Sequence, residues 1–442
     1  MSSIETRTRT EDRLHLIAQP DMRAIIRTIA FVIATISLCI LLISFRPFTP
    51  SAPEDAGGGD IINQLGFACL GAVALLSLGM FANPRKVVTI ISPAWMLMIA
   101  FLFLSVLTSP EPSVAIRGVL LTMIGILTII TVLALPQDGD SYSSMLFTVA
   151  SVVIVISYAG VVILPSLGTH GSDAAEPQNA YLWRGLFTHK NIAGPIMAAF
   201  AFAGVYLFRR GWRISGLLIA VSALFFVAQT GSKTSAALVP FAMLIVIGPG
   251  IFGLRLLAPI TIFAIQFLFA LFTIGTILFA PIGEIVQQLD VDPTFTGRTS
   301  IWAFAVDALL QRPWTGFGYE SFWSTPDVKQ AANPYYLDWD VRGIVHGHNG
   351  YLDIAVSMGL PALACAILVI IIMPLMNYAR CRPIRENLLL ADLFLMIVFF
   401  GTLNAMLESF FFRRMDPVWL ILVFAIFGLR MTAKITILKR SL

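Results

Sequence analysis

Charged residues are scarce in this sequence. Asp, Glu, Lys and Arg make up 12% of its 442 residues, whereas 57% of the residues are hydrophobic. An ordinary soluble domain carries about 25% charged residues, so the composition excludes such a domain and indicates a polytopic membrane protein. The formal net charge is only +4, and the basic residues are spread over short loops without forming one patch. This distribution argues against a nucleic-acid partner.

Cysteine is rare as well. The sequence has four cysteines, which lie in apolar runs or beside a basic loop and form no CxxC pair: Cys39, Cys69, Cys365 and Cys381. This spacing excludes a disulfide framework and a zinc finger. The N-terminal segment also lacks the short apolar run and small-residue cleavage site of a signal peptide, so we expect a cytoplasmic tail over residues 1–26.

Long apolar runs, in contrast, follow one another along most of the chain. A transmembrane helix needs about 20 mostly apolar residues, and about 12 runs meet this length. They lie near residues 27–45, 61–82, 87–107, 114–135, 145–165, 192–208, 214–229, 235–253, 256–280, 351–375, 388–408 and 416–433. The predicted fold is an all-α polytopic membrane protein with transmembrane helices within 27–280 and 351–433, a large polar loop over 281–350, and a second cytoplasmic tail over 434–442.

The basic residues give this prediction an orientation, because Lys and Arg concentrate in cytoplasmic loops. With the N-terminus inside, the basic clusters at 209–213 and 380–385 fall on the cytoplasmic side and the large loop falls outside. Apolar residues at helical spacing over 301–309 predict an amphipathic helix on the outer leaflet. Thr299 or Ser300 is its expected N-cap, and Pro313 ends it.

Several cations lie on the outer side, where the same rule disfavours them. They stand mostly at the ends of apolar runs: Arg117, Arg184, Lys190, Lys233, Arg298 and Arg413. Each one alone could be a side chain reaching the lipid headgroups. Together they favour a polyanionic ligand, and a diphosphate is the natural candidate because arginine pairs bidentately with phosphate oxygens.

The C-terminal edge of the large loop brings two histidines to the start of an apolar run. His346 and His348 could share a metal, but zinc needs a third and a fourth ligand, and no other outer histidine has a recognisable ligand spacing. Asp290 and Asp292 resemble the metal-binding pair of nucleotide-sugar enzymes, whose substrates are not expected outside the cytoplasm. We therefore expect no metal.

A second interpretation makes His348 a general base. Asn349 is a plausible N-cap for the following helix, and the positive helix end favours a neutral imidazole that can accept a proton from a hydroxyl. Asn349 and His346 would then lie beside the substrate. Glu320 and Asp353 are competing bases, and Asp353 could instead orient the imidazole. The simplest alternative is that both histidines are merely hydrogen-bonded within the loop.

The aromatic run between Trp314 and Trp323 is punctuated by Gly316 and Gly318. Its glycine spacing does not match a Walker loop or a dinucleotide fingerprint. Its rings suit either stacking on sugars or a belt at the membrane interface.

Five segments occur in an order that resembles the O-antigen ligase and Wzy polymerase superfamily. They are Arg184-Gly-Leu-Phe-Thr-His-Lys190-Asn191, Thr230-Gly-Ser-Lys233-Thr-Ser235, Thr296-Gly-Arg298-Thr-Ser-Ile-Trp302, Gly316-Phe-Gly318 and His346-Gly-His348-Asn349-Gly-Tyr-Leu-Asp353. The resemblance covers most of residues 102–361. Within the superfamily the chain is most similar to exopolysaccharide polymerases of the succinoglycan (ExoQ-like) type.

This resemblance implies a glycosyltransferase that needs neither metal nor cofactor and uses undecaprenyl-diphosphate-linked sugars at the periplasmic face of the bacterial inner membrane. Besides the bilayer, a flippase and a chain-length co-polymerase are the implied partners. The family's histidine matches His348, its diphosphate-binding arginines match Arg184 and Arg298, and a further arginine matches Arg117. Lys233 replaces an arginine of the family, which keeps the charge but loses the bidentate geometry.

The expected reaction is an inverting transfer in which His348 deprotonates an acceptor hydroxyl that attacks a lipid-linked donor sugar. A polymerase would use a second lipid-linked repeat unit as acceptor, and a ligase would use a sugar of the lipid A core. A transporter or flippase is the alternative from another class. It would carry ionisable residues at the middle of its spans, whereas those of this sequence cluster at outer span ends.

Overall fold

The computed structural model describes residues 22–49, 60–171, 177–288, 295, 297–331 and 340–440. The Asp290 and Asp292 pair and the first residues of the N-terminal tail lie outside these ranges. Within them the chain forms helices and no strand, apart from one antiparallel bridge between Thr169 and Trp183. The predicted all-α class is confirmed.

Nine helices of the described residues are long and apolar enough to cross a membrane. They are α2 (Met22–Ile43), α3 (Ile61–Phe81), α6 (Pro112–Ala134), α7 (Gly139–Ile163), α9 (Lys190–Arg210), α11 (Lys233–Ile251), the continuous Gly350–Ala379 segment, α19 (Arg385–Asn404) and α20 (Pro417–Lys434). A tenth is added if α4 (Pro84–Ile90) and α5 (Pro93–Thr108), bent by 66°, count as one span. The chain is a polytopic membrane protein.

The other two predicted spans fall on shorter apolar helices, α10 (Arg213–Gln229) and α12 (Leu257–Phe272). The run expected over 256–280 is not one helix. It is divided into α12, α13 (Gly275–Leu278) and the beginning of α14 (Ala280–Gln288). Gly275 and Pro281 stand next to these breaks and favour them, because both residue types weaken a helix interior.

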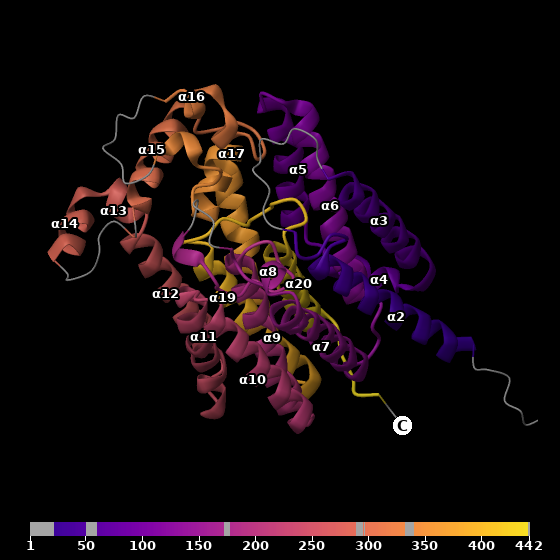
Figure 1. Cartoon of the computed structure of the whole chain (residues 1–442). Helices are drawn as coiled ribbons and strands as arrows, with labels where there is room; N and C mark the ends of the chain where they lie inside the picture. The colour runs from indigo at the N-terminus through magenta and orange to yellow at the C-terminus, as the bar shows by residue number, and fades with distance from the viewer. Residues whose placement is uncertain are drawn as a thin grey trace, which may run out of the picture.

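The centre of the bundle is α19, which is buried over nearly its whole length and packs against α9, α11 and α20 (Figure 1). Small residues allow close helix packing where α9 meets α10. A Cβ atom on Gly204 would lie 2.5 Å from the backbone nitrogen of Ala220, and one on Gly216 would lie 2.4 Å from that of Phe208. Close van der Waals packing of this kind is what holds helices together in lipid, where burial of apolar surface gives no advantage.

The segment Gly350–Ala379 contains α17 (Gly350–Ile367), a π-helical stretch Leu368–Ile372 and α18 (Met373–Ala379). Its helix is interrupted at Gly359, whose φ is +84°. The Gly-Phe-Gly turn is hydrogen-bonded along this break: the N–H of Phe317 donates to the carbonyl of Val356 at 2.8 Å, and that of Gly318 to Ser357 at 3.0 Å. A Cβ on Gly316 would collide with the backbone of Ser357, so this glycine serves close packing.

Within the large loop, residues 297–331 form a cap at one end of the bundle, with α15 (Arg298–Gln311) and α16 (Pro326–Lys329) near α17 (Figure 1). The predicted helix of the loop is therefore present, but it begins after Gly297, whose φ is +82°, and no side chain caps it. Its apolar residues, including Ile301 and Trp302, belong to a hydrophobic cluster with Leu352 and Val356 of α17. The expectation that this side lies on lipid is wrong, because protein covers it.

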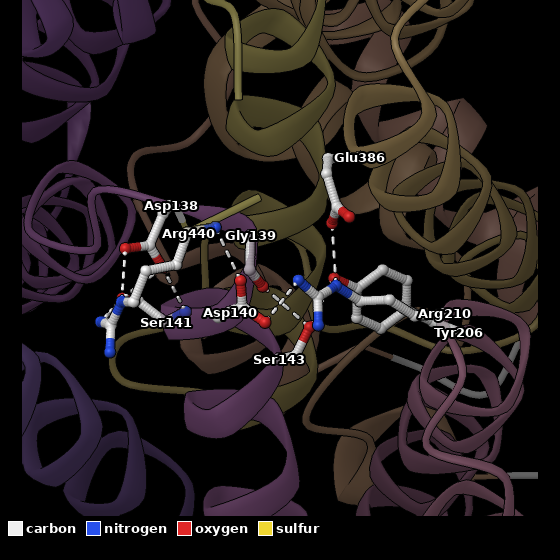
Figure 2. A network of polar contacts seen from close by, with 9 residues as sticks. All are labelled: Asp138, Gly139, Asp140, Ser141, Ser143, Tyr206, Arg210, Glu386 and Arg440. Atoms are coloured by element: carbon white, nitrogen blue, oxygen red, sulfur yellow. Dashed lines mark hydrogen bonds and ion pairs between the residues drawn. The ribbon is translucent and has the colours of Figure 1, made fainter. Parts of the chain in front are cut away.

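The two ends of the bundle differ in their charged residues. We call the end with His189, His346 and His348 the histidine face, and the end with Arg209 and Arg210 the arginine face. At the arginine face, the buried Arg210 guanidinium lies 2.9 Å from Asp140 of α7 and 2.8 Å from Glu386 of α19 (Figure 2). Arg440 pairs with Asp138 at 3.1 Å and so fastens the C-terminal segment to the start of α7. These ion pairs join α7, α9 and α19.

Candidate functional site

The starts of α9, α15 and α17 meet the α19–α20 connection at the histidine face. Asn349 anchors this junction. As predicted, it caps α17, since its Oδ1 accepts the N–H groups of Tyr351 and Leu352, both at 3.1 Å. Its Nδ2 donates to the carbonyl of Met406 at 3.1 Å, and its backbone N–H donates to Ser409 Oγ at 3.0 Å. Both ends of the amide are thus occupied by the protein, and its predicted contact with substrate stays a prediction.

His348 directly precedes this cap and has a left-handed backbone, with φ of +48°. Side chains other than glycine rarely adopt this conformation, which recurs at functional sites where the surroundings hold it. The imidazole is partly exposed, and its Nδ1 lies 3.4 Å from Oε2 of Glu408. A proton from a substrate could be accepted at the other ring nitrogen, Nε2.

Glu408 connects three parts of this face. Its Oε1 lies 3.1 Å from Nη2 of Arg298, at the start of α15, and accepts a hydrogen bond of 3.3 Å from Nδ2 of Asn191, at the start of α9. Burial by itself would raise the pKa of Glu408. The contact with His348 and the charge of Arg298 outweigh burial and lower this pKa below the usual glutamate value. Glu408 is therefore an ionised carboxylate at neutral pH.

The second predicted histidine, His346, stacks edge to face with His348, with ring centroids 4.2 Å apart. Its Nδ1 accepts the backbone N–H of His348 at 3.4 Å, which supports the left-handed turn. Burial, the nearby His348 and the charges of Arg413 and Arg298 lower the pKa of His346 well below the usual histidine value. His346 is neutral, and its predicted contact with a substrate stays a prediction.

A second pair of histidines lies at the start of α9, with ring centroids of His170 and His189 4.6 Å apart. Nε2 of His170 accepts the N–H of Lys190 at 3.0 Å, and Nδ1 of His189 caps α9 by accepting the N–H of Asn191 at 3.1 Å. This cap places the Asn191 side chain next to Glu408. Among the described residues, no group of three or more His, Cys, Asp or Glu could hold a metal ion, and metal independence stays a prediction.

Arg184 is placed differently from Arg298. Only 4% of it is exposed, and its guanidinium donates to five backbone carbonyls, which belong to Phe48, Thr49, Thr169, Phe187 and Thr188. Burial lowers the pKa of this guanidinium. The structure thus gives Arg184 the role of fastening two loops together. Its predicted contact with a diphosphate would require some of these hydrogen bonds to be exchanged.

The remaining predicted cations lie at helix starts and in the α19–α20 connection. Lys190 and Lys233 begin α9 and α11, and Lys233 is exposed; these two helices pack together at their starts, since a Cβ on Gly194 would lie 2.9 Å from Ser235 Oγ. Arg413 lies in the α19–α20 connection, close enough for its charge to lower the pKa of His346. These three cations lie on elements that meet at the histidine face.

Arg117 and Glu320 lie on the α6 side of this face. Arg117 is exposed and its Nε donates to the carbonyl of Ser113 at 3.1 Å. Glu320 accepts the N–H of Arg414 at 3.3 Å and has a left-handed φ of +49°. The contacts of Glu320 within the described part of the chain do not include His348, so its role as a competing base stays a prediction without geometric support.

Asp353 holds the histidine turn in place. Its Oδ1 accepts the indole N–H of Trp323 at 2.8 Å and the backbone N–H of Gly347 at 3.0 Å. The suggestion that Asp353 orients the imidazole stays a prediction, and the carboxylate next to Nδ1 of His348 belongs to Glu408. Asp353 acts on the backbone one residue earlier.

The aromatic run is mostly part of the core. Phe317, Tyr319, Phe322 and Trp323 are buried, while Trp314 is exposed. Neither stacking on sugars nor an interfacial belt describes the four buried rings. They form the packing that joins the cap to α17 and α6, and only Trp314 remains available for either predicted role.

Glu408 and Asn191 are the site residues that the sequence analysis missed. Glu408 stands between the apolar run of α19 and the aromatic triplet Phe410 to Phe412. An acidic residue beside a membrane span is costly and is a functional hypothesis by default. That signal was present, but nothing local connected position 408 with position 348.

Comparison with known proteins identifies one family. Residues 191–367 match the family model described as O-antigen ligase. The matched segment begins at Asn191, includes Arg298 and His348, and ends with α17; Glu408 lies beyond it. A search of the curated proteins finds no match. The predicted superfamily is thereby confirmed, and the finer likeness to exopolysaccharide polymerases stays a prediction.

Proposed function

We propose that this chain, whose residues 191–367 match the O-antigen ligase family, is a glycosyltransferase that polymerises undecaprenyl-diphosphate-linked oligosaccharide repeat units into exopolysaccharide. The observation that carries the proposal is the juxtaposition of a base, its carboxylate and a cation. His348 Nδ1 lies 3.4 Å from Glu408, and the same carboxylate lies 3.1 Å from Arg298. Such a group can remove a proton and can offset the charge of a departing diphosphate.

The reaction follows from this arrangement. Nε2 of His348 accepts the proton of an acceptor sugar hydroxyl, and the oxygen attacks the anomeric carbon of the donor glycan. A new glycosidic C–O bond forms as the bond to the diphosphate breaks, and the electron pair leaves with the lipid diphosphate. Attack opposite the leaving group inverts the anomeric configuration.

The leaving group needs charge compensation more than a proton. A diphosphate is a good leaving group once cations balance the charge that develops on it. Arg298 contacts the same Glu408 carboxylate as the base, and Arg413, Lys190 and Lys233 lie on neighbouring elements. The step as written uses only groups of the chain and its two substrates.

We place the histidine face in the periplasm of the bacterial inner membrane. Basic residues of the arginine face, including Arg209, Arg210 and Arg385, agree with a cytoplasmic location under the positive-inside rule. Lipid-linked units would then reach the site from the outer leaflet. A flippase that delivers these units and a co-polymerase that sets chain length are the partners this orientation calls for.

A ligase is the second candidate, favoured by the description of the matched family. Its chemistry at His348 would be the same, but its acceptor would be a sugar of the lipid A core. The two functions differ in what accumulates when transfer stops. A polymerase leaves single repeat units on the lipid carrier, whereas a ligase leaves long chains on the carrier and a bare core.

The test is a chromosomal His348→Ala substitution. Loss of the base should lower transfer at least about 100-fold, while donor binding and membrane insertion persist. For a polymerase, cells should accumulate single lipid-linked units and lose high-molecular-weight polysaccharide, as measured by gel sizing and mass spectrometry of extracted lipids.

Lys329→Ala, a change of an exposed residue on α16, is the matched control and should leave chain length unchanged. Wild-type chain length in the His348→Ala strain would exclude the base role. Long chains stranded on the carrier would assign the protein to the ligases.

A further inference from the structure

The Glu408 carboxylate is shared between two groups that have different tasks in the proposed reaction. Oε2 faces Nδ1 of His348 at 3.4 Å, and Oε1 faces Nη2 of Arg298 at 3.1 Å. The Glu408 side chain is only 20% exposed, so water screens these interactions weakly. One negative charge thus attracts both the base and the diphosphate cation.

The surrounding contacts hold Glu408 in this position. Asn191 Nδ2 donates to Oε1 at 3.3 Å, and the backbone carbonyl of Glu408 accepts the N–H of Gly350 at 3.1 Å. The charged and titratable groups that act most strongly on Glu408 include His348, Arg298 and His189. Glu408 is therefore tied to the starts of α9, α15 and α17 at once.

We propose that Glu408 is a positioning residue that couples diphosphate binding to the base, an inference that rests on the proposed function. A diphosphate bound by Arg298 competes with Oε1 for the guanidinium. As Arg298 turns toward the phosphates, the carboxylate charge acts more fully on His348. The Nδ1–H of the imidazole then donates to Glu408, which fixes the tautomer with an unprotonated Nε2 and stabilises the imidazolium formed during transfer.

This coupling predicts opposite effects on binding and on transfer. Glu408→Gln keeps the size of the side chain and its hydrogen-bond acceptor for Asn191 but removes the charge. Arg298 is then released to the ligand, so diphosphate binding should become tighter by about three- to tenfold. Transfer should fall by at least about tenfold because the imidazole has lost its carboxylate. A merely structural role would weaken both.

The experiment uses the full-length protein in nanodiscs. Binding is measured with undecaprenyl diphosphate as the probe, and transfer with lipid-linked repeat units extracted from the deletion strain, across a range of pH. With Glu408→Gln, the acidic limb of the pH-rate profile should move to lower pH, because the imidazolium has lost its stabilising carboxylate. Asp327→Asn, which removes an exposed carboxylate of α16, is the matched control and should behave as the wild type.

Weaker or unchanged binding by a folded Glu408→Gln protein, or an unmoved pH profile, would overturn the coupling. If this variant does not fold, Glu408→Asp is measured in its place. Because aspartate keeps the charge, the pH profile should stay in place. The rate of transfer should fall because the aspartate side chain is shorter. A shifted profile with Asp would then count against the proposal. His348→Ala distinguishes failure of the proposed function from failure of the coupling. Wild-type transfer by His348→Ala would reject the base role. An inactive His348→Ala protein together with wild-type binding and transfer by Glu408→Gln would reject the coupling alone.

Discussion

Two arginines with the same predicted role, Arg184 and Arg298, differ in their contacts. The sequence predicts that both Arg184 and Arg298 bind the diphosphate. Arg184 is enclosed and donates to five backbone carbonyls, whereas Arg298 is about one-fifth exposed and faces one carboxylate. A guanidinium that already satisfies backbone carbonyls contributes to the fold, while one paired with a single carboxylate can exchange it for phosphate.

We therefore expect the two alanine substitutions to fail in different ways. Arg184→Ala leaves buried carbonyls without donors, which should cost about 2 kcal/mol of stability or more, seen as a lower thermal unfolding temperature. Arg298→Ala should keep the unfolding temperature and weaken binding of undecaprenyl diphosphate by about tenfold or more. Calorimetry and binding on the purified proteins distinguish these results.

Lys329→Ala serves both measurements as the control. A stable Arg184→Ala protein that has lost diphosphate binding would support the predicted contact between Arg184 and the diphosphate. Undiminished binding by Arg298→Ala would count against a contact between Arg298 and the diphosphate.

At the level of elements, the break in α17 decides where the cap formed by residues 297–331 of the large loop is attached to the bundle. Gly359 adopts φ of +84°, and a Cβ there would lie 2.4 Å from the carbonyl oxygen of Trp314. The N–H of Leu360 donates to the carbonyl of Pro313 at 2.8 Å, and the Gly-Phe-Gly turn pairs with the preceding turn of α17. The interrupted helix turn thus provides the hydrogen-bonding groups that hold the aromatic run between Trp314 and Trp323.

Gly359→Ala should consequently lower the free energy of unfolding by more than the left-handed backbone conformation alone accounts for. Gly253 is a matched control, since its φ is +74° and no atom lies within 4 Å of the position that a Cβ would take there. Gly253→Ala should cost about 1 kcal/mol from the left-handed conformation, and Gly359→Ala should cost about 1–3 kcal/mol more from the collision. Equal unfolding temperatures for the two variants would contradict this account of the break.

For the whole molecule, the two faces of the bundle differ in how their charged groups are buried and paired. The arginine face is closed by buried ion pairs that join α7, α9 and α19 (Figure 2). Breaking such a pair leaves an uncompensated buried charge, which is strongly destabilising. The histidine face carries partly exposed groups on the starts of helices and on a connection, which can change partners without separating the bundle.

The orientation of these faces is open to a labelling test. In a version without its four native cysteines, a cysteine replacing Lys329 should react with a membrane-impermeant thiol reagent in intact spheroplasts. A cysteine replacing Lys439, exposed at the other face, should react only after lysis. The reverse pattern would place the histidine face in the cytoplasm and reject the proposed topology.

The sequence by itself determined the fold class, because a backbone in lipid must satisfy its hydrogen bonds within each segment and an apolar run of sufficient length is a local property. It also identified the cap at Asn349 and the helix at Arg298–Gln311, which depend on neighbouring residues. Only the tertiary structure decided that Glu408 meets His348 across 60 positions, that Arg184 is enclosed by carbonyls, and that protein covers the apolar side of α15. Those outcomes depend on which helices pack together, and this packing is a property of the assembled bundle that no single stretch of residues encodes.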